Sequence, residues 1–296
     1  MKILLLGKGG QLGWELQRSL APLGELVALD RESPQGCGDL ARPEALADTV
    51  RDVAPQIIVN AAAYTAVDKA EAEPDRARLI NATAPGELAR QAQALDAWLV
   101  HFSTDYVFDG SGDRPWREAD ATGPLNVYGH TKLEGEQAVQ AHCQRHLILR
   151  TSWVYSARGG NFAKTILRLA AERDELTVID DQFGAPTSAE LLADATSLML
   201  RELQRQPQAA GLYHLCAAGQ TSWHAYATHV IERASQLRPE QPLKVRQIRP
   251  VPSSAFQTAA RRPHNSRLDT RHLVSTFGLR LPPWQQGVDR MLSEIL

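Results

Sequence analysis

A tyrosine and a lysine four residues apart, Tyr128 and Lys132, have the types and the spacing to do acid–base chemistry. They lie in the segment PLNVYGHTKLEGEQ, at the start of an expected helix, where residues i and i+4 share one face. A tyrosine with its ordinary pKa of about 10 is a poor acid–base group at neutral pH. A nearby ammonium and a cationic nicotinamide ring would favour its phenolate and lower that pKa. The spacing also occurs in ordinary helix packing. An assignment to acid–base chemistry therefore also needs a cofactor site and a third polar group elsewhere in the sequence.

The third polar group is expected in FSTDYVFD, which follows a predicted strand. Ligands of parallel α/β sheets bind at the carboxyl ends of the strands, so Thr104 or Ser103 would present a hydroxyl to a cofactor there. Thr104, Tyr128 and Lys132 together offer an oxygen clamp, a proton donor and an electrostatic partner for that donor. Hydride transfer to or from a carbinol needs these three functions.

A glycine-rich turn, GKGGQLG, joins the first expected strand to the first expected helix. Gly7, Gly10 and Gly13 follow the pattern G-x-x-G-x-x-G, and Gln11 and Leu12 complete the turn. Glycine permits a tight turn and a close approach of backbone N–H groups to a pyrophosphate, and the helix N-terminus favours the anion. We predict a dinucleotide site here; a glycine-rich turn without a ligand is the alternative.

The adenosine end of the cofactor has candidate contacts after the second and third expected strands. Asp30 ends VALD, where a carboxylate meets free ribose hydroxyls, and it favours NADH. Arg31 follows and can pair with the 2′-phosphate of NADPH, so both cofactors stay open. The predicted cofactor residues outside the glycine turn, Tyr128 and Lys132 are Asp30, Arg31, Asp39, Leu40, Ala61, Ala62 and Ala63.

The elements that must position these residues alternate between strands and helices. Short apolar runs predict strands at Lys2–Leu6, Leu26–Leu29, Gln56–Asn60, Trp98–Phe102 and His146–Arg150. Helical patterns cover Gln11–Leu20, Arg42–Val53, Asn81–Leu95 and Tyr128–Cys143. This alternation predicts an α/β fold with a Rossmann-type, doubly wound parallel sheet that binds a dinucleotide in residues 1–150.

Residues 151–296 show a looser pattern. Asn161–Arg173 and Ser188–Gln204 look helical, and Ala259–Leu268 is basic and contains a proline. We expect a smaller C-terminal α/β lobe that mainly binds the substrate, with some of its segments returning to the sheet.

Composition narrows the class of protein. Of the 296 residues, 43% are hydrophobic and 22% are charged, which is typical of a globular protein. The net charge is −2, so the chain is less basic than a general nucleic-acid binder. Cys37, Cys143 and Cys216 are far apart, which argues against a disulfide framework and against structural zinc. The apolar run in MKILLLG is too short for a signal segment or a membrane span. We therefore expect a cytoplasmic protein with no nucleic-acid or membrane partner.

Motifs along the whole chain resemble the dTDP-4-dehydrorhamnose reductase family, within the extended short-chain dehydrogenase/reductase superfamily. The matching segments are ILLLGKGGQLGWELQ, VNAAAYTAVDKAE, HFSTDYVFDG, LNVYGHTKLEGE, RTSWVY, NFAKTILRLA, VIDDQFGAPT, GLYHL and ARRPHNSRL. The resemblance implies that NADPH or NADH reduces the C4 ketone of a dTDP-sugar. It implies that Tyr128 protonates the C4 oxygen, that Lys132 tunes Tyr128 and holds the nicotinamide ribose, and that Thr104 bonds the same oxygen.

The resemblance also implies substrate and metal residues. Besides Thr104 and Tyr128, the candidates for the sugar are Val67, Asp105 and Trp153, and those for the nucleotide and pyrophosphate are Asn161, Gln182 and Arg261–Arg267. Some family members are dimers bridged by magnesium through glutamates, and the candidates here are Glu15, Glu190 and Glu294. Solvated surface charges are the alternative for these glutamates, and a homodimer stays open.

Other functions are compatible with the same fold. A sugar-nucleotide 4,6-dehydratase has Thr-Asp-Glu after the fourth strand, whereas this chain has Thr104-Asp105-Tyr106 and so lacks the glutamate base. A 4-epimerase keeps its NAD tightly bound through turnover. A non-catalytic subunit, like the regulatory subunits of methionine adenosyltransferase, does not need Thr104, Tyr128 and Lys132 intact.

Overall fold

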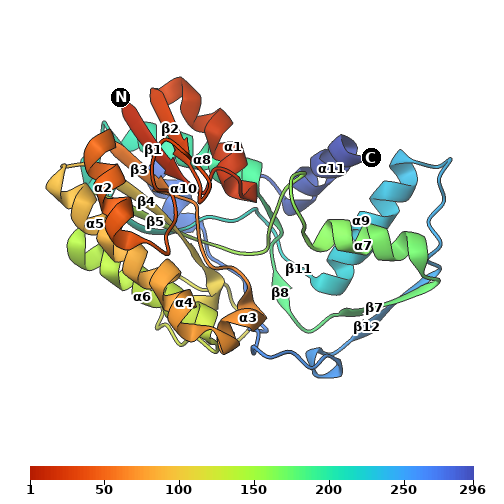
Figure 1. Ribbon diagram of the computed structural model, residues 1–296. Helices are drawn as coiled ribbons and strands as arrows, with labels where there is room; N and C mark the ends of the chain where they lie inside the picture. Colours follow the sequence, from red (N-terminus) through yellow and green to blue (C-terminus); the bar gives the residue numbers. More distant parts are fainter.

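A parallel sheet of six strands forms the centre of the larger lobe, on the left of Figure 1. The computed structural model describes all residues from Met1 to Leu296. The strand order is β10-β5-β4-β3-β1-β2, and every neighbouring pair is parallel. The strands are β1 (Lys2–Leu6), β2 (Glu25–Leu29), β3 (Ile57–Asn60), β4 (Trp98–Thr104), β5 (His146–Thr151) and β10 (Gly211–His214). The predicted doubly wound parallel fold is confirmed.

The five strands predicted from apolar runs are all present; β1 has the predicted ends, and the other four differ at one end by one or two residues. Apolar runs were sufficient here because a parallel sheet is covered on both faces, and β3 and β4 are buried along their whole length. The largest difference is at β4, which continues past Phe102 to Thr104. Thr104 is therefore the last residue of the strand, at the edge where ligands bind.

Helices on both faces of the sheet form the outer layers (Figure 1). One face carries α1 (Gln11–Leu20) and α8 (Ala189–Leu203); the other carries α2 (Pro43–Val53), α5 (Ala84–Ala94) and α6 (Val127–His142). The helix predicted from Asn81 begins as an α-helix only at Ala84, because Leu79–Thr83 form a wider π-helical turn. Two short helices before it, α3 (Val67–Ala72) and α4 (Pro74–Arg78), were not predicted.

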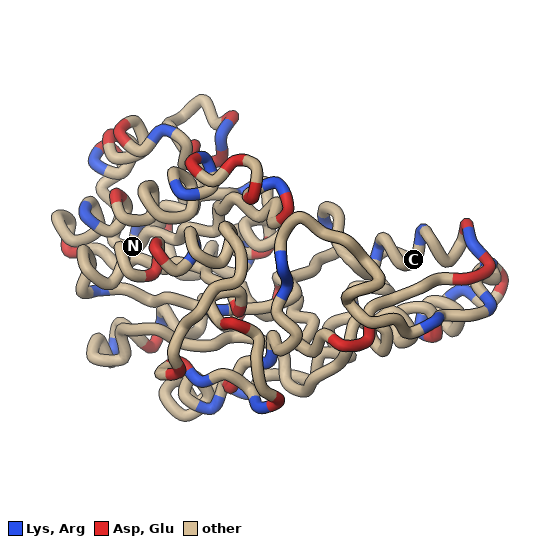
Figure 2. The backbone as a smooth tube through the Cα atoms, turned by 90° about the horizontal axis from the view of Figure 1, so that it is seen from below, with Lys and Arg blue, Asp and Glu red and all other residues tan.

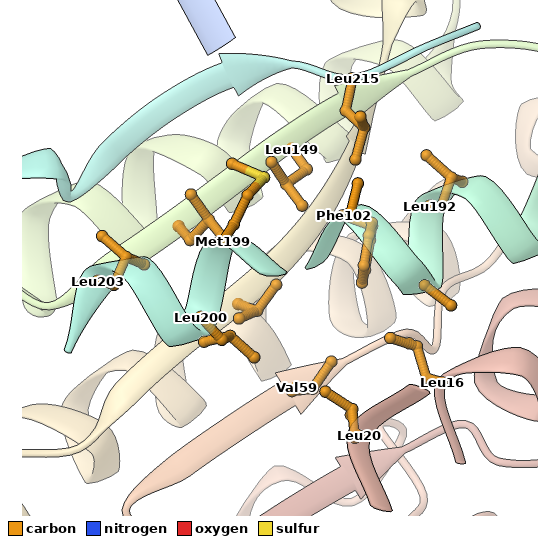
Figure 3. Packing of buried hydrophobic residues seen from close by; sticks show 14 of the residues in the cluster. Leu16, Leu20, Val59, Phe102, Leu149, Leu192, Met199, Leu200, Leu203 and Leu215 are labelled. Carbon is orange, nitrogen blue, oxygen red and sulfur yellow. The ribbon is translucent and has the colours of Figure 1, made fainter. Parts of the chain in front are cut away.

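Helix α8 completes the core under the sheet although it lies late in the chain. In Figure 3, Leu192, Met199 and Leu203 point from α8 toward the strands, where they meet side chains such as Leu149 and Phe102. This cluster also contains residues of α1 and β1. Segments beyond residue 150, among them β10, are thus part of the larger lobe.

The smaller lobe, on the right of Figure 1, is mainly helical. It contains α7 (Phe162–Glu172), α9 (Trp223–Leu237) and α11 (Trp284–Ile295), with its own core around Tyr226 and Trp284. Its strand pairs are β7 (Glu175–Ile179) with β12 (Gln247–Val251), β6 (Val154–Tyr155) with β9 (Thr187–Ser188), and β8 (Phe183–Gly184) with β11 (Thr221–Ser222). Helices α9 and α11 were not predicted. A domain boundary at residue 150 stays a prediction.

The surface carries charges of both signs. Figure 2 shows Lys and Arg interspersed with Asp and Glu along the backbone. Cys37, Cys143 and Cys216 are free, and the last two are buried. No helix combines the length and the apolar character needed to cross a bilayer.

One further helix of the larger lobe, α10 (Arg271–Phe277), packs on β10.

Candidate active site

The predicted dinucleotide turn lies where the strand order reverses, between β1 and β3. Gly7 follows β1 with a φ of +87°, and a Cβ atom there would lie 2.9 Å from the backbone N of Ala62, which follows β3. A Cβ on Gly13 would lie 1.9 Å from the carbonyl oxygen of Gly7. Both positions therefore require glycine, and the turn holds two strand ends and a helix in close contact.

The N-terminus of α1 is free to bind an anion. Its N-cap is Gly10, which has no side chain to cap the helix, and the first helical hydrogen bond runs from Trp14 N to Gly10 O at 2.9 Å. The N–H groups of Gln11, Leu12 and Gly13 precede that bond and have no acceptor within the helix. These groups and the helix dipole fit the pyrophosphate of a dinucleotide.

The predicted adenosine contacts lie after β2. Asp30 accepts a hydrogen bond from the Ser33 hydroxyl at 2.8 Å, and this bond is the main cause that lowers the pKa of Asp30, so the carboxylate is charged at neutral pH. Arg31 is exposed. The Asp39 carboxylate accepts from Ala41 N at 3.0 Å, whereas the side chain of Leu40 is buried in the core. Leu40 can therefore contact a cofactor only through its backbone.

Thr104 and Tyr128 are brought together at the carboxyl end of β4. Helix α6 begins beside this edge with Asn126 as its N-cap, whose Oδ1 accepts from Gly129 N at 2.8 Å. The Thr104 hydroxyl lies close enough to the phenol of Tyr128 to lower the pKa of that phenol. Ser103 points to the opposite side and donates to Glu136 at 2.5 Å. The structure thus selects Thr104, rather than Ser103, as the hydroxyl next to Tyr128.

The pKa of Tyr128 differs from the sequence-based prediction. Burial raises it to about 12, with a lowering by the Thr104 hydrogen bond and a further increase from Asp105. We expected a nearby ammonium to lower this pKa, but the Lys132 Nζ donates to the carbonyl of Phe102 at 2.6 Å. Burial also lowers the pKa of Lys132 to about 8. Tyr128 is therefore a neutral phenol at neutral pH, the form that can donate a proton.

Asp105 offers an unused hydrogen-bonding atom beside this pair. Asp105 is 2% exposed, and burial raises its pKa to about 7, while the nearby Ser266 and Thr104 hydroxyls act in the opposite direction. The Thr104 hydroxyl lies 3.1 Å from Oδ1, while Oδ2 has no partner. A buried carboxyl oxygen without a partner is costly, so this atom is suited to bind a hydroxyl of a ligand.

An aromatic wall in the smaller lobe contains Trp153. Its ring stacks on Trp223 with centroids 3.6 Å apart and an angle of 14°, and its backbone has a φ of +50°. Gln182 accepts from Trp223 Nε1 at 3.1 Å and donates to Ser253 at 3.2 Å, so it orients the stack. Trp223 was not predicted, because a single aromatic residue at a helix start gives no distinctive sequence signal.

Asn161 lies next to the dinucleotide turn. It is the N-cap of α7, and its Nδ2 lies 3.4 Å from Oε1 of Gln11. Ser156 donates to the same oxygen at 3.3 Å. A residue predicted for the nucleotide sugar and a residue predicted for the cofactor are thus in contact, at the point where the two lobes meet.

The Arg261–Arg267 segment crosses from the smaller lobe to the larger one. Arg262 forms a 2.6 Å ion pair with Asp68, which follows Val67 at the start of α3. Arg267 donates to Asn265 at 2.8 Å. Arg261 is exposed, and its carbonyl accepts from the N-cap of α6. Of these arginines, Arg262 is held by Asp68 within the protein, whereas Arg261 projects into solvent.

The three predicted metal ligands do not form a metal site within one chain. Glu190 pairs with Arg290 at 2.9 Å, and Glu15 lies 3.6 Å from Arg18. Burial and then repulsion from Glu190 raise the pKa of Glu15, and Glu294 adds to this increase. No three His, Cys, Asp or Glu side chains gather closely enough to hold a metal ion.

Comparison with known proteins identifies relatives of the same length. The RmlD substrate binding domain family matches residues 1–296. A dTDP-4-dehydrorhamnose reductase from Shigella flexneri is 59% identical over 295 residues, which cover 100% of this chain and 98% of that protein.

Two solved structures are also similar over the full length. A dTDP-4-dehydrorhamnose reductase from Clostridium acetobutylicum has a TM-score of 0.89 and 34% identity, covering 100% of this chain and 99% of its own. One from Bacillus anthracis, in complex with NADP, has a TM-score of 0.87 and 34% identity, covering 99% of each chain.

Proposed function

This chain belongs to the RmlD substrate binding domain family, and from that membership we propose that it reduces the C4 ketone of dTDP-4-dehydro-L-rhamnose to dTDP-L-rhamnose. The reductant is NADPH or NADH. The observation that supports the proposal is that Thr104 ends β4 close enough to the Tyr128 phenol to lower its pKa, with Lys132 one turn further along α6, at the sheet edge that also carries the dinucleotide turn. The 59% identity to a reductase over the whole chain supports the substrate.

Tyr128 and Thr104 act on the C4 oxygen of the ketosugar. The nicotinamide cofactor, when bound, supplies the hydride that goes to C4. Tyr128 gives its phenolic proton to the C4 oxygen, and Thr104 donates a hydrogen bond to the same oxygen. Lys132 binds the nicotinamide ribose, and its ammonium stabilises the phenolate that remains. One hydride and one proton convert the ketone to the alcohol.

Asp105 and Trp153 are proposed to hold the sugar. The unpartnered Oδ2 of Asp105 accepts or donates a hydrogen bond to a sugar hydroxyl, and the Trp153 ring packs against the apolar face of the sugar. Val67 completes this site from α3, and Asn161, Gln182 and the Arg261–Arg267 segment face the nucleotide and pyrophosphate.

Tyr106 argues against a dehydratase. It occupies the place of the glutamate base, and its ring packs edge-on against Tyr128 with centroids 5.6 Å apart. Burial raises the pKa of Tyr106 above its ordinary value, so its phenol stays protonated. A neutral phenol cannot accept the proton that an elimination must remove, and this supports simple ketone reduction.

Asp30 and Arg31 bear on which nicotinamide cofactor binds. The charged Asp30 suits the free ribose hydroxyls of NADH, and the exposed Arg31 suits the phosphate of NADPH, so we propose that both bind. We also propose that the enzyme is cytoplasmic. A homodimer that shares magnesium between the Glu15, Glu190 and Glu294 side chains of two chains is a separate proposal, tested by the mass of the assembly with and without magnesium.

The experiment that tests the function is a turnover assay of the purified chain with dTDP-4-dehydro-L-rhamnose and each reduced cofactor. We expect cofactor oxidation matched mole for mole by dTDP-L-rhamnose. The uridine analogue of the substrate tests the nucleotide base. Absence of turnover with both cofactors, together with tight binding of a protein partner, would instead support a non-catalytic subunit.

A further inference from the structure

A buried row of three polar side chains leads from β3 to the lysine of α6. Asn60 and His101 are paired in register on β3 and β4, and Asn60 Nδ2 lies 3.3 Å from His101 Nδ1. The other ring nitrogen, Nε2, lies 3.3 Å from Nζ of Lys132. All three side chains are at most 2% exposed, so their hydrogen bonds must be satisfied within the protein.

The backbone determines where the proton of His101 lies. Ala62 N–H donates to Asn60 Oδ1 at 3.2 Å, which turns the amide nitrogen of Asn60 toward the ring. That nitrogen can only donate, so His101 Nδ1 must accept and the neutral ring carries its proton on Nε2. Nε2–H then points at Lys132, which accepts it as an uncharged amine and donates its own N–H to Phe102 O at 2.6 Å.

A charged Lys132 needs the opposite arrangement. An ammonium has donors only, so His101 Nε2 must accept, Nδ1 must carry the ring proton, and Asn60 must turn its oxygen toward the ring. This turn takes Oδ1 away from the N–H of Ala62. The network then holds one additional proton, taken from solvent, on Lys132. Ala62 lies in the predicted cofactor-binding segment, so a bound cofactor can offer its N–H another acceptor.

We propose that Asn60 and His101 are positioning residues that couple the cofactor-binding segment to the charge on Lys132. In the free chain they favour the uncharged amine over the ammonium. A ligand that accepts the N–H of Ala62 frees the Asn60 amide to turn and allows the ammonium to form. The role of Lys132 in catalysis rests on the proposed function, but its proton can be followed in the free chain without turnover.

The other ionisable groups near Lys132 lie on α6, on β5 and at the end of β4. Glu136 lies one turn further along α6 and raises the pKa of Lys132, while burial lowers that pKa to about 8. Arg150 of β5 is paired with Glu136 at 2.6 Å. Tyr128 lies one turn before Lys132, and Asp105 acts on Tyr128 from the end of β4. None of these groups sets the tautomer of His101, which follows from Asn60.

The test is an NMR titration of labelled lysine side chains in the cofactor-free protein, with Lys132 assigned by the signal that Lys132→Arg removes. We expect its midpoint at about 8 in the natural chain. Asn60→Asp should raise the midpoint by about one pH unit, because a carboxylate accepts Nδ1–H and leaves Nε2 to accept from the ammonium. His101→Gln should raise the Lys132 midpoint as well, since the oxygen of the new amide can face Lys132 in either orientation of Asn60. If Asn60→Asp does not fold, His101→Gln alone tests the proposal.

The double variant Asn60→Asp/His101→Gln separates the proposed coupling from direct attraction by the new carboxylate. Coupling through the ring predicts no further rise beyond His101→Gln. An unchanged midpoint in either single variant, or a full additional rise in the double variant, overturns the proposal. His214→Gln, the same change at another buried histidine, should leave the midpoint unchanged.

The link to the cofactor has its own readout, the protons taken up when NADH binds at a pH of about 8, close to the Lys132 midpoint. The natural chain should take up more protons than Asn60→Asp, in which Lys132 is already charged. Equal uptake by both chains overturns the link. These measurements use no ketosugar, so a chain that fails to reduce the sugar can still pass them.

Discussion

Glu136 of α6 and Arg150 of β5 form a two-point ion pair inside the protein. Their nitrogen–oxygen distances are 2.8 and 2.6 Å, and the side chains are 2% and 4% exposed. The pair joins the helix that carries Tyr128 and Lys132 to the sheet, so the position of these two side chains depends on it.

Removing the charge of Glu136 should destabilise the fold strongly. Glu136→Gln leaves Arg150 buried and without its counter-charge, which costs about 3–5 kcal/mol of unfolding free energy. Urea unfolding followed by circular dichroism measures it. The matched control is Glu172→Gln, which breaks an exposed pair with Arg168 and should cost less than about 1 kcal/mol. Equal losses of unfolding free energy in the two variants would show that the buried pair contributes no more to stability than the exposed pair.

The hydroxyl of Tyr128 should be needed for turnover and not for cofactor binding. Tyr128→Phe removes the general acid and should lower kcat by about 10²–10⁴-fold, while NADPH affinity, measured by fluorescence, stays close to that of the natural chain. Tyr213→Phe is the control, because Tyr213 is also buried but its hydroxyl only donates to Ala209 in the larger lobe. Natural turnover in Tyr128→Phe would contradict the assigned chemistry.

Replacing Lys132 should affect both binding and pH dependence. Lys132→Met removes the proposed ribose contact, so we expect weaker NADPH binding. The pH optimum should rise, because the natural chain loses its ammonium near the Lys132 pKa of about 8 and the variant has no such group to lose. Turnover and cofactor affinity measured across pH give both results. Lys69→Met, at an exposed ion pair with Glu73, should reproduce neither effect.

The buried carboxyl of Asp105 should make stability fall as pH rises. Its folded pKa is raised from 3.8 to about 7, so its favourable contribution is complete below the unfolded pKa and is lost as pH increases through the folded one. Asp105→Asn cannot ionise. At about 1.4 kcal/mol per pKa unit, the variant should gain up to roughly 4 kcal/mol relative to the natural chain between acidic and mildly alkaline pH.

Urea midpoints on the two sides of the Asp105 transition measure this gain. Asp120→Asn is the control, because Arg114 lowers the pKa of Asp120 to about 2 and that carboxylate stays charged over the whole interval. Its effect on stability should therefore be constant with pH. A constant effect of Asp105→Asn would mean that Asp105 stays ionised in the folded chain.

The fold could be predicted, and candidate reacting residues could be named, because their signals are local. A buried parallel strand is a continuous apolar run, a dinucleotide turn is a spacing of glycines, and Tyr128 and Lys132 are four residues apart on one helix. The π-helical turn at Leu79–Thr83 was not predicted, since its residues follow the same apolar pattern as an α-helix.

What could not be predicted depends on residues far apart in the sequence. Trp223 stacks on Trp153 only because β6 and the start of α9 meet in the smaller lobe. The pKa of Tyr128 was expected to fall, whereas burial raises it, and burial depends on everything packed around the side chain. The contact between His101 and Lys132 likewise requires β4 and α6 to be in place.

The position of α8 and β10 late in the chain has a consequence for synthesis. Leu16 and Leu20 of α1 share one apolar cluster with Leu192 and Met199 of α8, and β10 closes the sheet beside β5. A ribosome releases the N-terminus first, so the apolar face of the early strands stays uncovered until His214 has emerged. The larger lobe can therefore complete its folding only after most of the polypeptide has been made. A nascent chain stalled near residue 150 would expose this face to chaperones or to other nascent chains.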